Sequence, residues 1–155
     1  TLSLHDALPI WYPLEKKPNA KILVLRYLTE GGAAPSTGKF LTYREIPWGE
    51  VYFRQFQGRC LMRLAFSYGN KLEAFKKVMT AMGAKPLEQG DCAFELEFME
   101  GFFIRLILWE GDDEFPPSSQ ILFSDNFAVT FAAEDLAVAG DICINMMKAV
   151  ERKLS

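Results

Sequence analysis

The chain has 155 residues, is 50% hydrophobic and carries 20 acidic against 17 basic side chains. This composition is typical of one domain built around a single hydrophobic core. The charge is nearly balanced and the basic residues are not clustered, which excludes the concentrated basic face that nucleic-acid binding needs. The longest apolar run, residues 102–109, is interrupted by Arg105. It is much shorter than the roughly 20 residues that span a bilayer, so the sequence also excludes a membrane span.

The first ten residues, TLSLHDALPI, are set apart from the rest. One reading frame of a widely used short-read sequencing adapter encodes all ten in order, and the chain does not begin with methionine. We therefore interpret residues 1–10 as a non-native, adapter-derived segment, and residues 11–155 as a single α+β domain that is truncated at its N-terminus. Without His5 the remaining chain has no histidine. A histidine-based triad and zinc sites of the His and Cys type are then excluded, so no catalytic residue and no metal site of that type is indicated.

The cysteines are odd in number and widely separated: Cys60, Cys92 and Cys143. None belongs to a CxxC pair, so they do not form the pattern of a disulfide framework or of a metal site. Scattered single thiols are typical of small, buried apolar residues in a reducing compartment. We therefore expect a cytoplasmic protein.

In chain order, the first predicted element is a helix that Asn19 can cap and that ends at the Gly-Gly pair after it. Its residues Ile22, Leu25 and Leu28 share one face, and neighbouring apolar residues widen that face. We therefore expect this helix to be buried. Residues 33–39 contain proline, serine and glycine, which predicts a surface loop.

An extended segment over residues 40–49 precedes helical spacing of apolar residues over residues 50–69, where Gly58 slightly weakens the prediction. A further helix is predicted over residues 71–83. The alternation of apolar and charged residues then predicts a β-hairpin over residues 92–109.

After the hairpin come an acidic loop, a short apolar run at residues 121–123 and a last helix from about Glu134 to Lys153. Glu134 and Asp135 fall in the first turn of that helix, where the helix dipole favours negative charge. The expected fold is therefore α+β, with three or four helices packed on a small antiparallel sheet that contains the hairpin.

The acidic loop, WEGDDEFP, is the most informative stretch for function, because it holds four carboxylates in five positions: Glu110, Asp112, Asp113 and Glu114. Such charges repel unless solvent, basic side chains or a metal ion screen them. Three interpretations follow: a solvated acidic turn, an ion-pair network with arginines, and a metal or substrate site. The best arginine partners are Arg59, Arg63 and Arg105. The preceding Trp109 fits the core, although it could also form the floor of a small pocket.

Two functional hypotheses rest on this loop. The first is a non-catalytic binding or accessory domain, in which the loop forms a recognition or structural site together with two arginines. The alternative is an enzyme that depends on a hard metal such as Mg²⁺, held by oxygen ligands from the loop and from Asp125. A third possibility, a purely structural subunit, predicts an exposed apolar patch. The candidate binding residues are Arg59, Arg63, Trp109, Glu110, Asp112, Asp113, Glu114, Asp125, Glu134 and Asp135.

Four blocks in this order resemble a known family: YREIPWGEVYFRQFQGR, the pair Gly90–Asp91, LILWEGDDEFPPSSQILF and AAEDLAVAGD. The family is the prokaryotic domain of unknown function 3786, and the resemblance covers nearly all of residues 11–155. It implies a mixed α+β domain without an established activity. Some relatives carry an iron–sulfur domain alongside, which would make an iron–sulfur protein a candidate partner, although this chain has no such cysteine cluster.

Two positions depart from the family pattern. The short apolar run is followed by Ser124 before Asp125, and Ala133 stands before Glu134 where relatives have threonine. The absence of threonine removes a good helix cap at that turn.

Overall fold

The computed structural model describes residues 18–29 and 34–155. Within these residues the protein is an α+β domain, as predicted, built on a five-stranded antiparallel sheet with the strand order β1-β5-β4-β3-β2. Residues 1–10 and the predicted end of the first helix lie outside the described residues. The strands are β1 (Phe40–Thr42), β2 (Lys85–Leu87), β3 (Cys92–Met99), β4 (Phe102–Trp109) and β5 (Ser118–Ser124).

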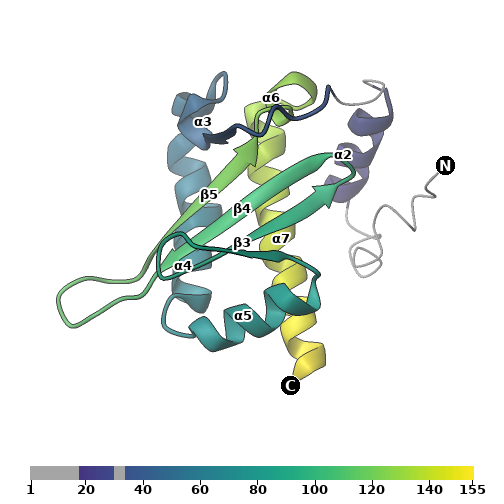
Figure 1. Cartoon of the computed structure of the whole chain (residues 1–155). Coiled ribbons are helices and arrows are strands. Elements are labelled where there is room, and N and C mark those ends of the chain that lie inside the picture. Colours follow the sequence, from purple (N-terminus) through teal and green to yellow (C-terminus); the bar gives the residue numbers. More distant parts are fainter. Residues whose placement is uncertain (1–17, 30–33) are drawn as a thin grey trace.

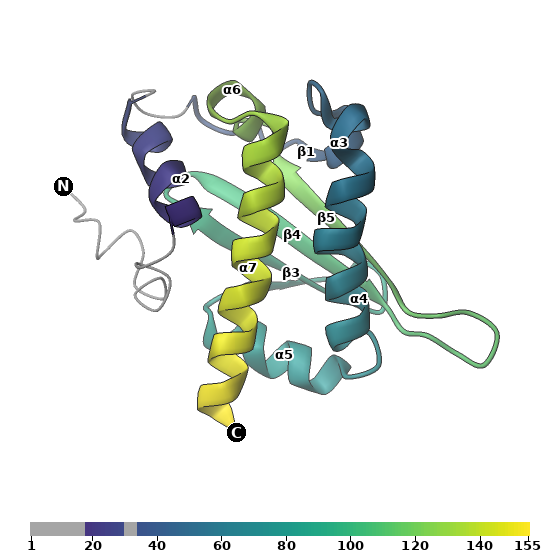
Figure 2. The ribbon, with the colours of Figure 1, turned by 180° about the vertical axis from the view of Figure 1, so that it is seen from behind.

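The two longest helical segments lie side by side across one face of the sheet (Figure 2). One is α7, and the other is the continuous run of α3, η3 and α4. Figure 1 views the opposite face, where the strands lie in front of these helices. The described helical segments are α2 (Pro18–Thr29), η2 (Tyr43–Glu45), α3 (Gly49–Phe56), η3 (Gln57–Met62), α4 (Arg63–Tyr68), α5 (Leu72–Ala81), α6 (Phe127–Thr130) and α7 (Ala133–Leu154).

The predicted hairpin is confirmed. Strands β3 and β4 pair in antiparallel register, with Glu95 opposite Arg105 and Leu96 opposite Ile104. Alternate residues of a strand point to opposite faces of the sheet, so Leu96 and Ile104 are buried under the helices while the Glu95–Arg105 pair lies on the other face. The side chains of this pair are joined by an ion pair of 3.0 Å.

The run from α3 to α4 buries one row of side chains spaced four residues apart: Phe56, Cys60, Leu64 and Tyr68 are all fully buried. In a regular α-helix a four-residue step overshoots one turn by about 40°, so three such steps would carry the row about 120° around the helix. The segment η3 between them is a π-helix. Its hydrogen bonds join residues five apart, which places more residues in each turn and removes much of this drift.

The first described helix, α2, corrects one prediction. It was expected to be buried, but Ile22, Leu25 and Leu28 are 48%, 59% and 56% exposed. The helix contacts the core through its other side, where Leu23 is 2% exposed. The ring of Tyr27 on that side meets Phe102 edge-on at 5.9 Å between centroids. The apolar residues encircle the helix, and packing on one side leaves the opposite stripe in solvent.

The three cysteines are buried and free, as the sequence predicted. Burial raises the pKa of the Cys60 thiol from 9.0 to about 12, so this thiol is neutral at physiological pH. None of the helices in residues 18–29 and 34–155 is long and apolar enough to cross a bilayer.

Candidate functional site

Because Trp109 ends β4 and β5 begins at Ser118, the acidic loop spans residues 110–117 in the structure. It joins β4 to β5 and projects beyond the end of the sheet (Figures 1 and 2). Its base is fixed by two side chains from other segments. The Asp91 carboxylate accepts a hydrogen bond from the backbone N–H of Glu110 at 2.7 Å, and the Asn70 side chain accepts one from that of Gly111 at 3.3 Å. A Cβ atom added to Gly69 would lie 2.3 Å from the Cβ of Pro117, so the loop base packs directly on the end of α4.

The tip of the loop is ordered by Asp112. One oxygen of its carboxylate accepts hydrogen bonds from the backbone N–H groups of Glu114 and Phe115, at 2.8 and 2.7 Å. The backbone N–H of Asp112 in turn donates to the carbonyl oxygen of Phe115. The bonds from Phe115 and Glu114 favour the ionised carboxylate and hold the pKa of Asp112 below its ordinary value of 3.8. Asp112 therefore shapes the turn, as aspartate often does in loops.

The other three carboxylates of the loop, on Glu110, Asp113 and Glu114, are exposed. None of them forms an ion pair with a residue in the described part of the chain. Phe115, next to them, is 66% exposed. This arrangement corresponds to the solvated acidic turn among the three interpretations, and it presents negative charge beside one aromatic ring.

The interpretation as an ion-pair network with Arg59 and Arg63 is wrong. Both guanidinium groups turn to α7, where Arg63 bonds Asp141 at 2.5 Å and Asn145 at 2.6 Å. Arg59 lies 3.7 Å from the same Asp141 carboxylate. The physical reason is position: the arginines lie on the side of their helix that faces α7, whereas the loop begins beyond the end of that helix. They join the two long helices to each other.

The third arginine, Arg105, also has a partner elsewhere. Besides its ion pair with Glu95, its guanidinium carbon lies 3.7 Å from the centre of the Phe40 ring. Trp109 was expected in the core, but it is 40% exposed because it ends β4 on the sheet face away from the helices. One ring atom would lie 3.3 Å from a Cβ added to Gly90, so the ring packs on that turn.

Asp125 lies far from the acidic loop. It follows β5, whereas the loop precedes it, and the seven residues of the strand separate the two by roughly 20 Å. Its carboxylate accepts hydrogen bonds from the hydroxyl and backbone N–H of Thr37 and from the Ser36 hydroxyl. The bond from the Thr37 hydroxyl is the main reason that the pKa of Asp125 is lowered. Asp125 therefore fastens the segment before β1 to the sheet.

The hard-metal alternative finds no ligand set in the structure. In residues 18–29 and 34–155, no three side chains of His, Cys, Asp or Glu are grouped so that they could hold a metal ion. Asp125 cannot join the loop carboxylates, because it is at the other end of β5.

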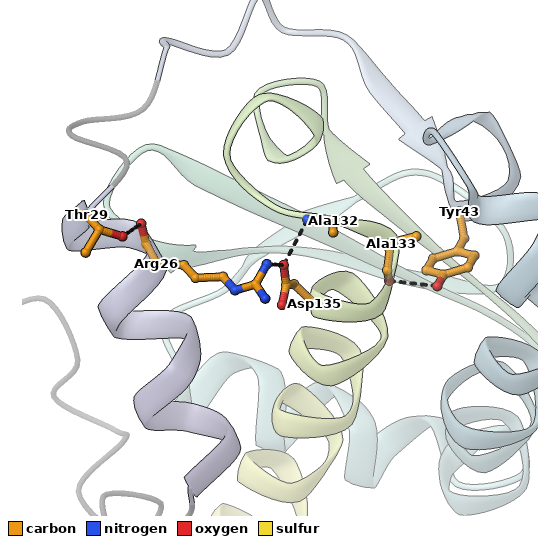
Figure 3. Close-up of polar contacts among 6 residues, drawn as sticks. All are labelled: Arg26, Thr29, Tyr43, Ala132, Ala133 and Asp135. Atoms are coloured by element: carbon orange, nitrogen blue, oxygen red, sulfur yellow. Dashed lines mark hydrogen bonds and ion pairs between the residues drawn. The ribbon is translucent and has the colours of Figure 1, made fainter.

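The two acidic residues at the start of α7, Glu134 and Asp135, have different roles, and Figure 3 shows the contacts of Asp135. Asp135 is only 7% exposed; its carboxylate accepts hydrogen bonds from Arg26 at 2.8 Å and from the backbone N–H of Ala132 at 2.9 Å. It thereby satisfies a backbone donor at the helix start without the missing threonine. Glu134 is exposed and bonds the Tyr52 hydroxyl, which raises the pKa of Tyr52.

A buried tyrosine holds the same turn from the other side (Figure 3). The Tyr43 hydroxyl donates a hydrogen bond of 2.7 Å to the carbonyl oxygen of Ala133. Burial raises the pKa of Tyr43 from 10.0 to about 12. Together, Tyr43 and Asp135 fix where α7 begins.

Three residues that organise the loop and the arginines were not among the candidates: Asn70, Asp91 and Asp141. Two of them stand in blocks that suggested the family, since Asp91 belongs to the pair Gly90–Asp91 and Asp141 follows the glycine at the end of AAEDLAVAG. Their membership in those blocks was the available signal. Asn70 follows Gly69 in a turn, and no sequence signal identified it as part of the site.

The fold and the loop define an α+β domain with an ordered acidic projection and no cluster of metal ligands among its described residues. The chain belongs to the family described as Domain of unknown function (DUF3786), whose sequence model matches residues 7–146. This confirms the resemblance. No curated protein and no solved structure matches the chain. The matched range includes residues 7–10, and the adapter origin of residues 1–10 remains a prediction.

Proposed function

We propose that this protein is a non-catalytic binding or accessory domain whose acidic loop recognises a protein partner. The partner surface would offer arginine or lysine next to apolar side chains. The observation that carries this proposal is the loop tip, where Asp112 holds Glu114 and the exposed ring of Phe115 in one fixed turn, next to Asp113.

Preorganisation supports a binding role. A loop that is already ordered loses less conformational entropy when a partner binds, so more of the interaction energy appears as affinity. The base of this loop is fixed by Asp91, Asn70 and the packing of Pro117, and its tip by Asp112. Several polar groups of the fold thus fix the conformation of a segment that contributes little to the core.

Charge supports the choice of partner. Unpaired carboxylates in solvent attract cations and speed association with a basic surface. An aromatic side chain beside them adds an apolar contact, and it can also stack on a guanidinium group. Arg59 and Arg63, which the sequence analysis assigned to this site, instead join α7 to the run from α3 to α4.

The test is an NMR titration of ¹⁵N-labelled protein with a synthetic helical peptide that carries arginine and phenylalanine on one face. We expect amide shifts concentrated at residues 110–115. The double variant Asp113→Asn, Glu114→Gln, which keeps the Asp112 turn, should lose them and bind about tenfold more weakly. The matched control Glu88→Gln, Glu100→Gln removes two exposed carboxylates elsewhere and should bind normally. Shifts outside the loop, or equal affinity for the loop variant, would refute the proposal.

A further inference from the structure

The outward side of the run from α3 to α4 carries a second row of residues spaced four apart: Arg54, Gly58, Met62 and Phe66. We call these four residues the outer row. The π-helical segment that aligns the buried row also aligns this one, since both have the same spacing across η3. All four residues are exposed, and Met62 and Phe66 are 48% and 64% exposed. Rows of this spacing form the ridges through which helices pack on each other.

Gly58 has no evident packing role within the part of the chain that the structure describes. Glycine in a helix interior costs about 1 kcal/mol relative to alanine. A Cβ atom added to Gly58 would meet nothing within 4 Å among residues 18–29 and 34–155, and the backbone φ of Gly58 is not positive. Neither close packing within the chain nor an unusual backbone conformation therefore requires glycine. The remaining physical use of an exposed glycine is to let another chain approach the helix closely.

The charges of this helix complement those of the acidic loop. Residues 49–68 hold one acidic residue, Glu50, and three arginines. Arg54 has no ion-pair partner in the described part of the chain, and neither have three carboxylates of the loop. The base of the loop is hydrogen-bonded to Asn70, beyond the end of α4, and Arg54 lies 16 residues before Asn70, which is about 24 Å along the helix. The two cannot meet within one molecule of this shape.

We propose that the outer row is the interface of a twofold-symmetric dimer of this protein. The partner that the acidic loop recognises is then a second copy of the chain, so this inference rests on the proposed function. The two helices pack antiparallel, with Gly58 of each copy opposite Met62 of the other. Arg54 of each copy then lies opposite Phe66 of the other, and the acidic loop of that copy begins about one helical turn further on. Each loop thereby reaches the unpaired arginine of the second copy.

This arrangement closes on itself, because a twofold axis uses the same surface of both copies. The apolar contact lies at the centre, where Met62 and Phe66 are buried, and the charged contacts lie at both ends. That is the usual order of protein interfaces, in which methionine, aromatic residues and arginine are enriched.

The test measures association by sedimentation velocity over a range of protein concentrations at low and high salt. The wild-type chain should form dimers that salt weakens. Gly58→Gln improves helix propensity, so it should not lower the urea midpoint of unfolding. Because its side chain occupies the proposed contact, it should raise the dimer dissociation constant by about tenfold or more. Met62→Lys gives a second test of the same contact. The control Lys77→Glu, on the exposed side of α5, should leave the dimer unchanged.

A charge exchange makes the test specific. Arg54→Glu alone, and Asp113→Arg with Glu114→Arg alone, should each be monomeric, because like charges then meet at both ends of the interface. Mixing these two variants restores opposite charges at both ends, so the mixture should form heterodimers. A wild-type chain that stays monomeric, a dimer insensitive to Gly58→Gln, or a mixture that does not associate would overturn the inference. Peptide binding at the loop by a strictly monomeric chain would leave the proposed function standing.

Discussion

The substitution Asp135→Ala should destabilise the fold through the start of α7. The Asp135 side chain is 9% exposed. Its carboxylate accepts a hydrogen bond from the backbone N–H of Ala132 and forms an ion pair with Arg26. Loss of a helix-capping acceptor costs about 1 kcal/mol. The ion pair adds less than a buried one, because the Arg26 side chain is 50% exposed and is screened by solvent, so its loss costs roughly a further 0.5–1 kcal/mol.

The expected loss is therefore about 2 kcal/mol in the free energy of unfolding, which corresponds to roughly 4–8 °C in Tm for a domain of this size. Urea denaturation followed by circular dichroism gives the free energy, and calorimetry gives Tm. Asp135→Asn keeps an acceptor for the Ala132 N–H and should lose about half as much. Arg26→Ala should cost about 0.5 kcal/mol, and the double mutant should reveal coupling between the two sites. A loss below about 0.5 kcal/mol for Asp135→Ala would show that α7 does not depend on this cap.

Two further outcomes follow from the site. Folding raises the pKa of Tyr43 from 10.0 to about 12, so the stability that this group contributes is complete below pH 10 and is lost as the pH rises toward 12. Tyr43→Phe should cost about 1 kcal/mol at pH 7 and should show a shallower loss of the urea midpoint above pH 10; an unchanged alkaline slope would contradict this. Millimolar Mg²⁺ or Ca²⁺ should leave Tm unchanged, because no three carboxylates of the described residues are grouped so that they could hold a metal ion. A dose-dependent rise that Asp113→Asn with Glu114→Gln removes would instead restore the hard-metal hypothesis.

The long elements with a regular pattern of apolar residues were predictable from the sequence. The apolar stripe of α7, with Leu136, Cys143 and Met147 all fully buried, and the alternation in β3 and β4 led directly to the observed structure. Strands β1 and β2 have three residues each, too few to show a period, and they exist because a neighbouring strand offers hydrogen bonds. The exposure of α2 depends on which side the rest of the domain covers, and its own residues do not encode that choice.

The candidate site also has a part that was predictable from the sequence and a part that was not. Composition alone located the acidic loop, because four carboxylates in five residues are a local property. The partners of Arg59 and Arg63 were not predictable, since Asp141 is 78 residues from Arg63 in sequence and meets it only through helix packing. Asp125 does not belong to the loop site, because it and the loop lie at opposite ends of the strand β5.

The π-helical segment also shows where this chain can change its length. Phe56 and Leu64 are eight residues apart, and a regular α-helix would bring residues seven apart to the same side, since seven residues make about two turns. The run from α3 to α4 thus holds one residue more than two regular turns require. Gly58 lies within this π-helical segment, and a Cβ atom at its position would touch none of the residues that the structure describes. A version of the protein one residue shorter at this point could therefore keep both buried flanks in place, so the helix accommodates an insertion without repacking the core.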